Sequence, residues 1–221
     1  MGAKYEMLFL SDMDNKSILT TISNVISKFG WYYNRHGFGK YSYWSDSPIW
    51  KFESSKEVTE CEMDKNDNIN KLTDIIELIS PFYSQSIVFH RSVNNRVMQA
   101  IASIVESPNL IWKEVGISWE LHDLFATYEN IDTISREVKE IFINLSTNLK
   151  PFYGKAAVEM KGLIDEPKQL EIEESTLGDF NYFSFECPNL DKLNNIAEKY
   201  EIFDYDGFGR FIYTNKHIGE H

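Results

Sequence analysis

Apolar residues recur along this chain with two periods, close to 3.6 and to 2, which predict helices and strands in alternation. Helices are predicted at residues 14–30, 69–79, 97–105, 134–149 and 190–200. Asp14 and Asn189 are the predicted caps of the first and last helices, and Asp132 or Thr133 is the predicted cap of the longest. Residues 121–128 fit either a short helix or an apolar loop. Strands are predicted at 5–10, in short pieces within 31–52, and at 58–64, 87–91, 110–119, 155–160, 182–186, 201–205 and 208–213.

Part of this pattern occurs twice. Residues 24–43 align with residues 195–213 through a single one-residue gap, and each copy predicts the end of a helix, a strand, a Gly-Phe-Gly turn and another strand. With the strands that precede them, the copies predict two pseudo-symmetric β-α-β-β units at about 5–44 and 182–213. The glycines sit between strands and not before a helix, so they indicate tight turns and not a phosphate-binding loop.

These elements together predict an α+β fold with a mostly antiparallel sheet and helices packed on it. The chain has 221 residues, of which 43% are hydrophobic and 14% aromatic, enough for a substantial core. No Gly/Ser-rich or Pro-rich linker divides it, which favours a single compact domain over residues 1–221.

The charge of the chain is strongly negative and unevenly distributed. The formal net charge is −12; residues 111–221 carry 21 acidic and 11 basic side chains, against 13 and 11 in residues 1–110. Nucleic-acid-binding proteins normally carry the opposite sign on the surface that binds, so no nucleic-acid partner is expected. A basic protein is the expected partner. No apolar run approaches membrane-spanning length and no signal-peptide region opens the chain, so no membrane partner and a cytoplasmic location are expected.

The acidic side chains gather in one polar segment between residues 162 and 180. They are Asp165, Glu166, Glu171, Glu173, Glu174 and Asp179, and Lys168 is the only base among them. One interpretation is a solvated connecting loop. The other is a docking surface that steers a basic protein partner onto this half of the chain, and these six residues are the predicted partner-binding site.

Catalytic chemistry has little support in the sequence. The five histidines show no metal-ligand spacing, and there is no Walker, G-x-S-x-G, H-E-x-x-H or C-x-x-C sequence, so no metal or other cofactor is expected. Cys61 and Cys187 are predicted to be buried, reduced thiols. One alternative is a small-molecule binder or enzyme with its site between the two repeats, in a pocket lined by Tyr43, Trp44, Trp50 and His90. Another is a phage or assembly component that oligomerises through an exposed strand edge.

The segment Leu-Lys-Pro-Phe-Tyr-Gly-Lys-Ala-Ala-Val-Glu at residues 149–159 resembles a segment of small proteins from low-GC bacteria, in which a helix leads into P-x-Y-G and a strand ending in Glu. Several of those proteins are similar to immunity proteins, which neutralise the polymorphic toxins of competing bacteria. The resemblance covers about a dozen residues and carries over no catalytic residue. It implies a protein that acts by binding. We therefore predict a non-enzymatic inhibitor with an acidic surface, such as an immunity protein for a bacterial toxin.

Overall fold

The computed structural model of the chain describes residues 2–34, 41–44, 71–106, 111–127, 130–160, 172, 176–196, 199–205, 207–215 and 217–218. The helices in these ranges are α1 (Asn15–Ser27), α2 (Leu72–Ile79), α3 (Leu121–Thr127), α4 (Ile131–Leu149) and α5 (Asp191–Ile196). The strands are β1 (Lys4–Ser11), β2 (Tyr32–Tyr33), β3 (Tyr41–Trp44), β4 (Ser84–Val93), β5 (Arg96–Glu106), β6 (Lys113–Glu120), β7 (Tyr153–Val158), β8 (Phe180–Ser184), β9 (Glu201–Tyr205) and β10 (Gly209–Tyr213).

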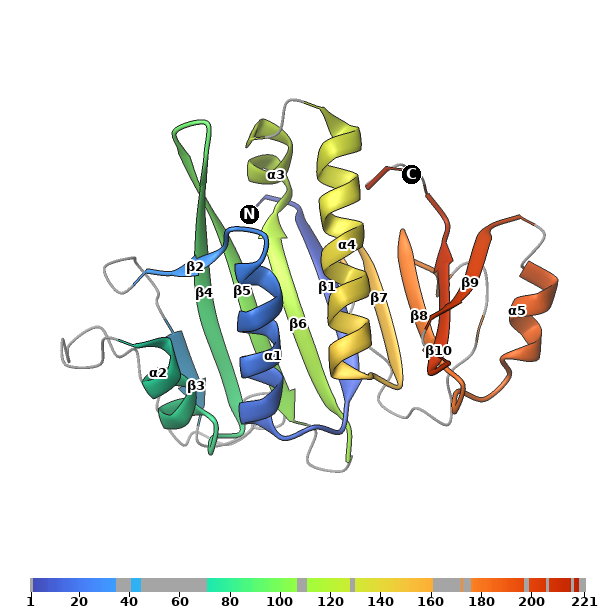
Figure 1. Ribbon diagram of the computed structural model, residues 1–221, viewed down its shortest axis with the longest axis horizontal. Coiled ribbons are helices and arrows are strands. Elements are labelled where there is room, and N and C mark those ends of the chain that lie inside the picture. Colours follow the sequence, from blue (N-terminus) through green and yellow to red (C-terminus); the bar gives the residue numbers. More distant parts are fainter. Residues whose placement is uncertain are drawn as a thin grey trace, which may run out of the picture.

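All of these strands belong to one sheet, in the order β2-β4-β5-β6-β1-β7-β8-β10-β9, with β3 also paired to β4. Every pairing in the described part of the chain is antiparallel. Helices α1, α3 and α4 cover one face of the middle of the sheet, while α2 lies near β3 and α5 lies beside β9 (Figure 1). The predicted α+β fold with an antiparallel sheet in one compact body is confirmed.

The sheet has apolar side chains on both faces, and they form two separate cores. Tyr182 and Phe211 belong to the large core beneath α1 and α4. Their neighbours in the chain, Phe183 and Ile212, belong to a smaller core with Leu193 of α5. Since successive residues of a strand point to opposite faces, the second core lies on the reverse face of the sheet, at its β7-β8-β10 end.

The packing of α4 on the sheet centres on one aromatic stack. Phe142 of α4 is fully buried and stacks on Phe9 of β1, with 5.3 Å between the ring centroids. Phe180 and Phe211 are the next rings, at 6.1 and 6.2 Å from Phe142. A Cβ atom on Gly154 of β7 would lie 2.6 Å from Cδ1 of Phe9, so the stack requires glycine at this position.

The predicted helix at residues 97–105 is wrong, because these residues lie in strand β5. Asn94 and Asn95 have φ angles of 50° and 62°, which form a tight turn and let β4 and β5 pair as a hairpin. Met98, Ala100 and other alternate residues of β5 are buried on the helix-covered face. The apolar residues between them created the false helical spacing.

Helix α4 begins earlier than expected. Its N-cap is Asn130, whose side-chain oxygen accepts a hydrogen bond from the backbone N–H of Thr133 at 2.8 Å, so the predicted caps Asp132 and Thr133 are wrong. The predicted cap of the first helix is confirmed, since Asp14 accepts a hydrogen bond from the N–H of Ser17 at 2.9 Å. Residues 121–127 are helical, which decides between the two interpretations of that segment.

The strand pairing does not follow the sequence repeat. Both copies run strand, helix, strand, strand along the chain. In the second copy β10 pairs with both β8 and β9, whereas in the first copy β2 and β3 pair with β4 and neither pairs with β1. The predicted strand at 58–64 and the turn at 37–39 lie outside the described residues. Within the described residues, no helix has the length and apolar character needed to span a membrane.

Replacing Phe142 by Ala is expected to lower the free energy of unfolding by about 3–5 kcal/mol, because it removes the central ring of the stack and leaves a cavity. Urea denaturation followed by circular dichroism measures the loss. Ile143→Ala is the matched control, since the neighbouring side chain is only half-buried and should lose clearly less. Equal losses in the two variants would contradict the assigned role of the stack.

Candidate binding pocket

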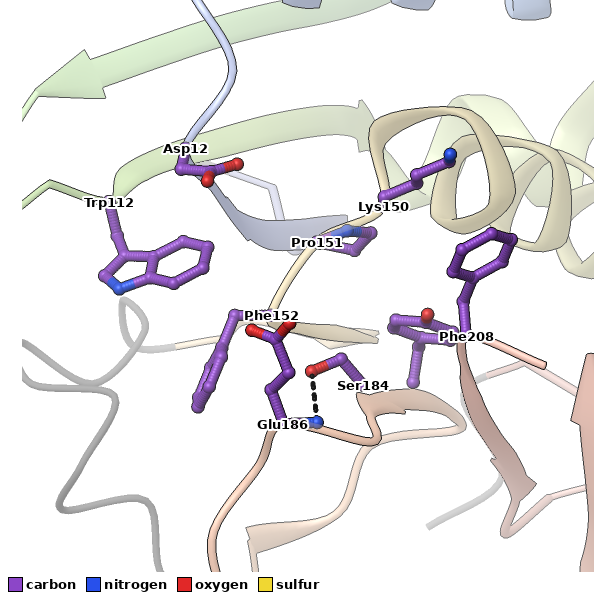
Figure 2. Close-up of a pocket in the computed structure, with 9 residues that line it drawn as sticks. Asp12, Trp112, Lys150, Pro151, Phe152, Ser184, Glu186 and Phe208 are labelled. Atoms are coloured by element: carbon purple, nitrogen blue, oxygen red, sulfur yellow. Dashed lines mark hydrogen bonds between the residues drawn. The ribbon is translucent and has the colours of Figure 1, made fainter.

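A pocket of about 200 Å³ opens where α4 ends, between the ends of β1, β7 and β8 and the turn that joins β9 to β10. Figure 2 shows side chains from all of these places converging on it. The residues that line it are Asp12, Trp112, Lys150, Pro151, Phe152, Tyr182, Ser184, Glu186 and Phe208. Because they come from well-separated parts of the sequence, only the folded chain brings them together.

The segment between α4 and β7 forms the frame of the pocket. Lys150 ends the helix in the left-handed region, with φ 45° and ψ 52°, and its N–H donates to the carbonyl oxygen of Ser146. Pro151 follows, and a residue before proline avoids the helical region. Phe152 is then held on both sides: its N–H donates to the carbonyl oxygen of Leu10 at 2.8 Å, and its carbonyl oxygen accepts from the N–H of Ser184 at 3.0 Å.

Aromatic rings form much of the pocket wall. The ring centroids of Trp112 and Phe152 are 5.1 Å apart, and Phe208 on the opposite side is 52% exposed. Phe208 lies in the β9–β10 turn, where Gly207 has a φ of 69°. A Cβ atom on Gly209 would lie 2.5 Å from the carbonyl oxygen of Phe183, so the strand that follows Phe208 can approach β8 only with glycine there.

Charged groups of both signs stand at the rim. The ammonium of Lys150 lies 4.5 Å from the centroid of the Phe208 ring, a cation–π arrangement. Asp12 and Glu186 are exposed, and neither carboxylate has an ion-pair partner among the residues that the structure describes. The backbone N–H of Glu186 donates to Oγ of Ser184 at 3.2 Å, which fixes the turn that carries this carboxylate (Figure 2).

The cysteine beneath the pocket is a structural thiol. Cys187 is buried and free, as predicted, and its Sγ donates to the carbonyl oxygen of Phe152 at 2.9 Å. Burial raises the pKa of this thiol to about 12, so at neutral pH it is not the thiolate that nucleophilic chemistry needs. Cys61 lies outside the described residues. Within the described ranges, no three His, Cys, Asp or Glu side chains gather as a metal site requires.

Five of the six predicted partner-binding acids, Asp165, Glu166, Glu171, Glu173 and Glu174, lie outside the described residues. The sixth, Asp179, is fully buried, so its carboxylate is not at the surface. Its Oδ1 accepts a hydrogen bond from Nδ2 of Asn215 at 2.5 Å, and its backbone carbonyl accepts from the N–H of Thr214 at 3.0 Å. Asp179 therefore attaches the C-terminal segment to the start of β8, a role that its polar neighbours in the sequence concealed.

Of the four residues of the predicted aromatic pocket, the structure describes the side chains of Tyr43 and His90, and these two lie on opposite faces of the sheet. Tyr43 stacks on Phe82, with the centroids 3.9 Å apart, and pairs in register with Gln85 of β4. His90 of β4 is buried five positions further on, so it faces the other side of the sheet, and burial lowers the pKa of its imidazole. The side chain of Trp44 and the whole of Trp50 lie outside what the structure describes.

Sequence reasoning missed the observed pocket, although two of its parts carried a signal. Residues 150–152 belong to the segment whose resemblance suggested a binding protein, and Phe208 is the centre of the second Gly-Phe-Gly turn. A hairpin turn lies at the surface, so an aromatic residue between its two glycines is expected to be exposed. These residues lie in one pocket with Trp112 and Asp12 only because of the strand order, which the sequence pattern does not predict.

Comparison with known solved structures adds a distant likeness. No known protein-family model and no curated protein matches the chain. Among solved structures, the Pseudomonas aeruginosa T6SS protein PA0821 is similar to it with a TM-score of 0.46 and 10% identity, over 96% of this chain and 68% of that one. A likeness this weak establishes neither a shared fold nor a shared function.

Alkylation of Cys187 by iodoacetamide at pH 8 is expected to be very slow in the native protein and fast in urea, because burial raises the thiol pKa to about 12 in the folded state only. The Cys61→Ser variant isolates this thiol for mass spectrometry. Fast alkylation in the absence of urea would contradict a buried, protonated Cys187.

Proposed function

We propose that this protein acts without catalysis, by binding a basic protein partner and blocking it, as an immunity protein blocks the toxin of a competing bacterium. We place the contact at the pocket end of the sheet, and we expect the acidic side chains within residues 165–174 to contribute to it. The free thiol of Cys187 fits a reducing compartment, and we place the action in the cytoplasm.

The observation that carries the proposal is the combination of apolar and acidic side chains around the pocket. Phe208 is 52% exposed, and Ile111 and Phe185, which adjoin pocket residues in the chain, are 81% and 43% exposed. Asp12 and Glu186 line the same pocket as Phe208. Exposed aromatic side chains that become buried on association provide most of the affinity of protein interfaces, and complementary charge provides the approach and the selectivity.

The net charge of −12 supports a basic partner over other classes. A nucleic acid would be repelled by this charge. A basic protein would be attracted over the distance that salt permits, about 8–10 Å at physiological ionic strength. The acids at 171, 173 and 174 are crowded with few bases nearby in the sequence, so they would add to this attraction and contribute little to folding.

Reversing the charge of Glu171, Glu173 and Glu174 to Lys is expected to leave the fold intact and to slow association with the partner. The immobilised wild-type protein should enrich a basic protein from the lysate of its source organism at low salt and lose most of it at high salt. The triple variant should enrich much less at low salt, because it removes long-range attraction. If the partner is a toxin, co-expression of the wild-type protein should restore growth of cells that produce it.

The control for this experiment is Glu140→Lys, which reverses one exposed charge on α4 outside the pocket. This variant should enrich nearly as much of the basic partner as the wild type does, with only the small decrease that its less negative net charge causes. The acidic surface would be rejected as the basis of binding by either of two results. One is enrichment that does not change with salt concentration, and the other is capture of the partner by the triple variant at the wild-type rate. Circular dichroism of each variant separates loss of binding from loss of fold.

A further inference from the structure

We propose that the pocket at the end of α4 receives one arginine side chain of the basic partner; this inference rests on the proposed function and names the group that the site recognises. The pocket volume of about 200 Å³ is below the range typical of drug-sized ligands, which suits a single side chain inserted from a protein surface. The chemistry of the walls then decides which side chain fits.

The walls combine the two features that a guanidinium requires. Trp112, Phe152 and Phe208 present aromatic surface, on which the planar, weakly hydrated guanidinium stacks. Asp12 and Glu186 supply carboxylates at the rim, and neither is engaged by a cation among the described residues. A carboxylate accepts two parallel hydrogen bonds from the arginine fork, which fixes the orientation of the incoming side chain.

The chain itself shows that the Phe208 ring accepts a cation. The ammonium of Lys150 lies 4.5 Å from its centroid, brought there by the left-handed turn that ends α4. An entering guanidinium meets this positive charge, but Asp12 and Glu186 outnumber it at the rim, so the sign of the pocket still favours a cation. The exposed lysine side chain can also move away, whereas Phe152 and the turn at Glu186 are held by the hydrogen bonds described above.

This balance gives Lys150 a diagnostic role. If the pocket takes arginine, removing the lysine charge removes a repulsion and strengthens binding. If the pocket takes an acidic side chain instead, Lys150 is the group that attracts it, and its removal weakens binding. The two ligand classes therefore predict opposite effects of the same substitution.

The test is an NMR titration of the full chain with N-acetyl-arginine amide, and separately with N-acetyl-glutamate amide and N-acetyl-norleucine amide. The indole N–H of Trp112, assigned with the Trp112→Phe variant, and the backbone N–H of Glu186 report on the pocket. Saturable shifts are expected with the arginine probe alone, with a dissociation constant on the order of 1 mM because one side chain supplies the contact. Shifts with the glutamate probe and none with the arginine probe would overturn the proposal.

The variants sharpen the result. Glu186→Gln and Asp12→Asn are each expected to weaken the arginine probe by about two- to fivefold, in line with exposed ion pairs. Lys150→Met, which removes the charge and keeps most of the length of the side chain, should tighten binding of the arginine probe by about twofold, and Glu140→Gln on α4 should leave it unchanged. The pocket would be rejected as an arginine site if neither Asp12→Asn nor Glu186→Gln changes the affinity for the arginine probe. A lower affinity in Lys150→Met would reject it as well.

Failure of this inference is distinguishable from failure of the proposed function. If the immobilised protein captures a salt-sensitive basic partner but the pocket ignores the arginine probe, the partner binds elsewhere and only the inference is lost. If the probe binds as expected but the capture experiment finds no salt-sensitive partner, the arginine site stands and the inhibitory function is rejected.

Discussion

The rest of the structure depends on the close contact between Phe9 of the central strand and Phe142 of α4, above a residue with no side chain. Gly154 leaves the space that the Phe9 ring occupies, and a methyl group there would overlap it. This contact packs α4 against the middle of the sheet. The helix ends at Leu149, and Lys150, Pro151 and Phe152 follow at once, so the pocket lies directly beyond the packed helix.

At this end of the molecule one residue belongs both to the core and to the pocket wall. Phe152 contributes to the smaller core on the reverse face and also lines the pocket. Its carbonyl oxygen accepts hydrogen bonds from the N–H of Ser184 and the thiol of Cys187, so the wall of the pocket is connected to β8 and to the turn beyond it. A wall held in this way does not collapse when the pocket is empty, which spares a ligand the cost of ordering it.

Much of the fold could be predicted from the sequence, and the errors have identifiable causes. Asp14 gave a correct cap because the hydrogen-bonding geometry of a cap is local. Strand β5 carries apolar residues on both faces, which gives it a helical spacing in the sequence, and the Asn94-Asn95 turn before it depends on positive φ angles at two residues other than glycine. The pocket was out of reach for another reason: Asp12, Trp112 and Glu186 meet only through a strand order that places β1 between β6 and β7.

The residues that shape the pocket differ from those exposed in it, and this difference affects how the sequence of such a protein diverges. Its frame lies in buried backbone and in glycines that admit no side chain, whereas Phe208, Glu186 and Asp12 project from that frame into solvent. Substitutions at exposed positions usually change stability by less than about 0.5 kcal/mol. Descendants of this chain can therefore exchange the side chains that we propose to meet a partner while the scaffold is inherited intact, so that the surface of the pocket can change faster than the architecture.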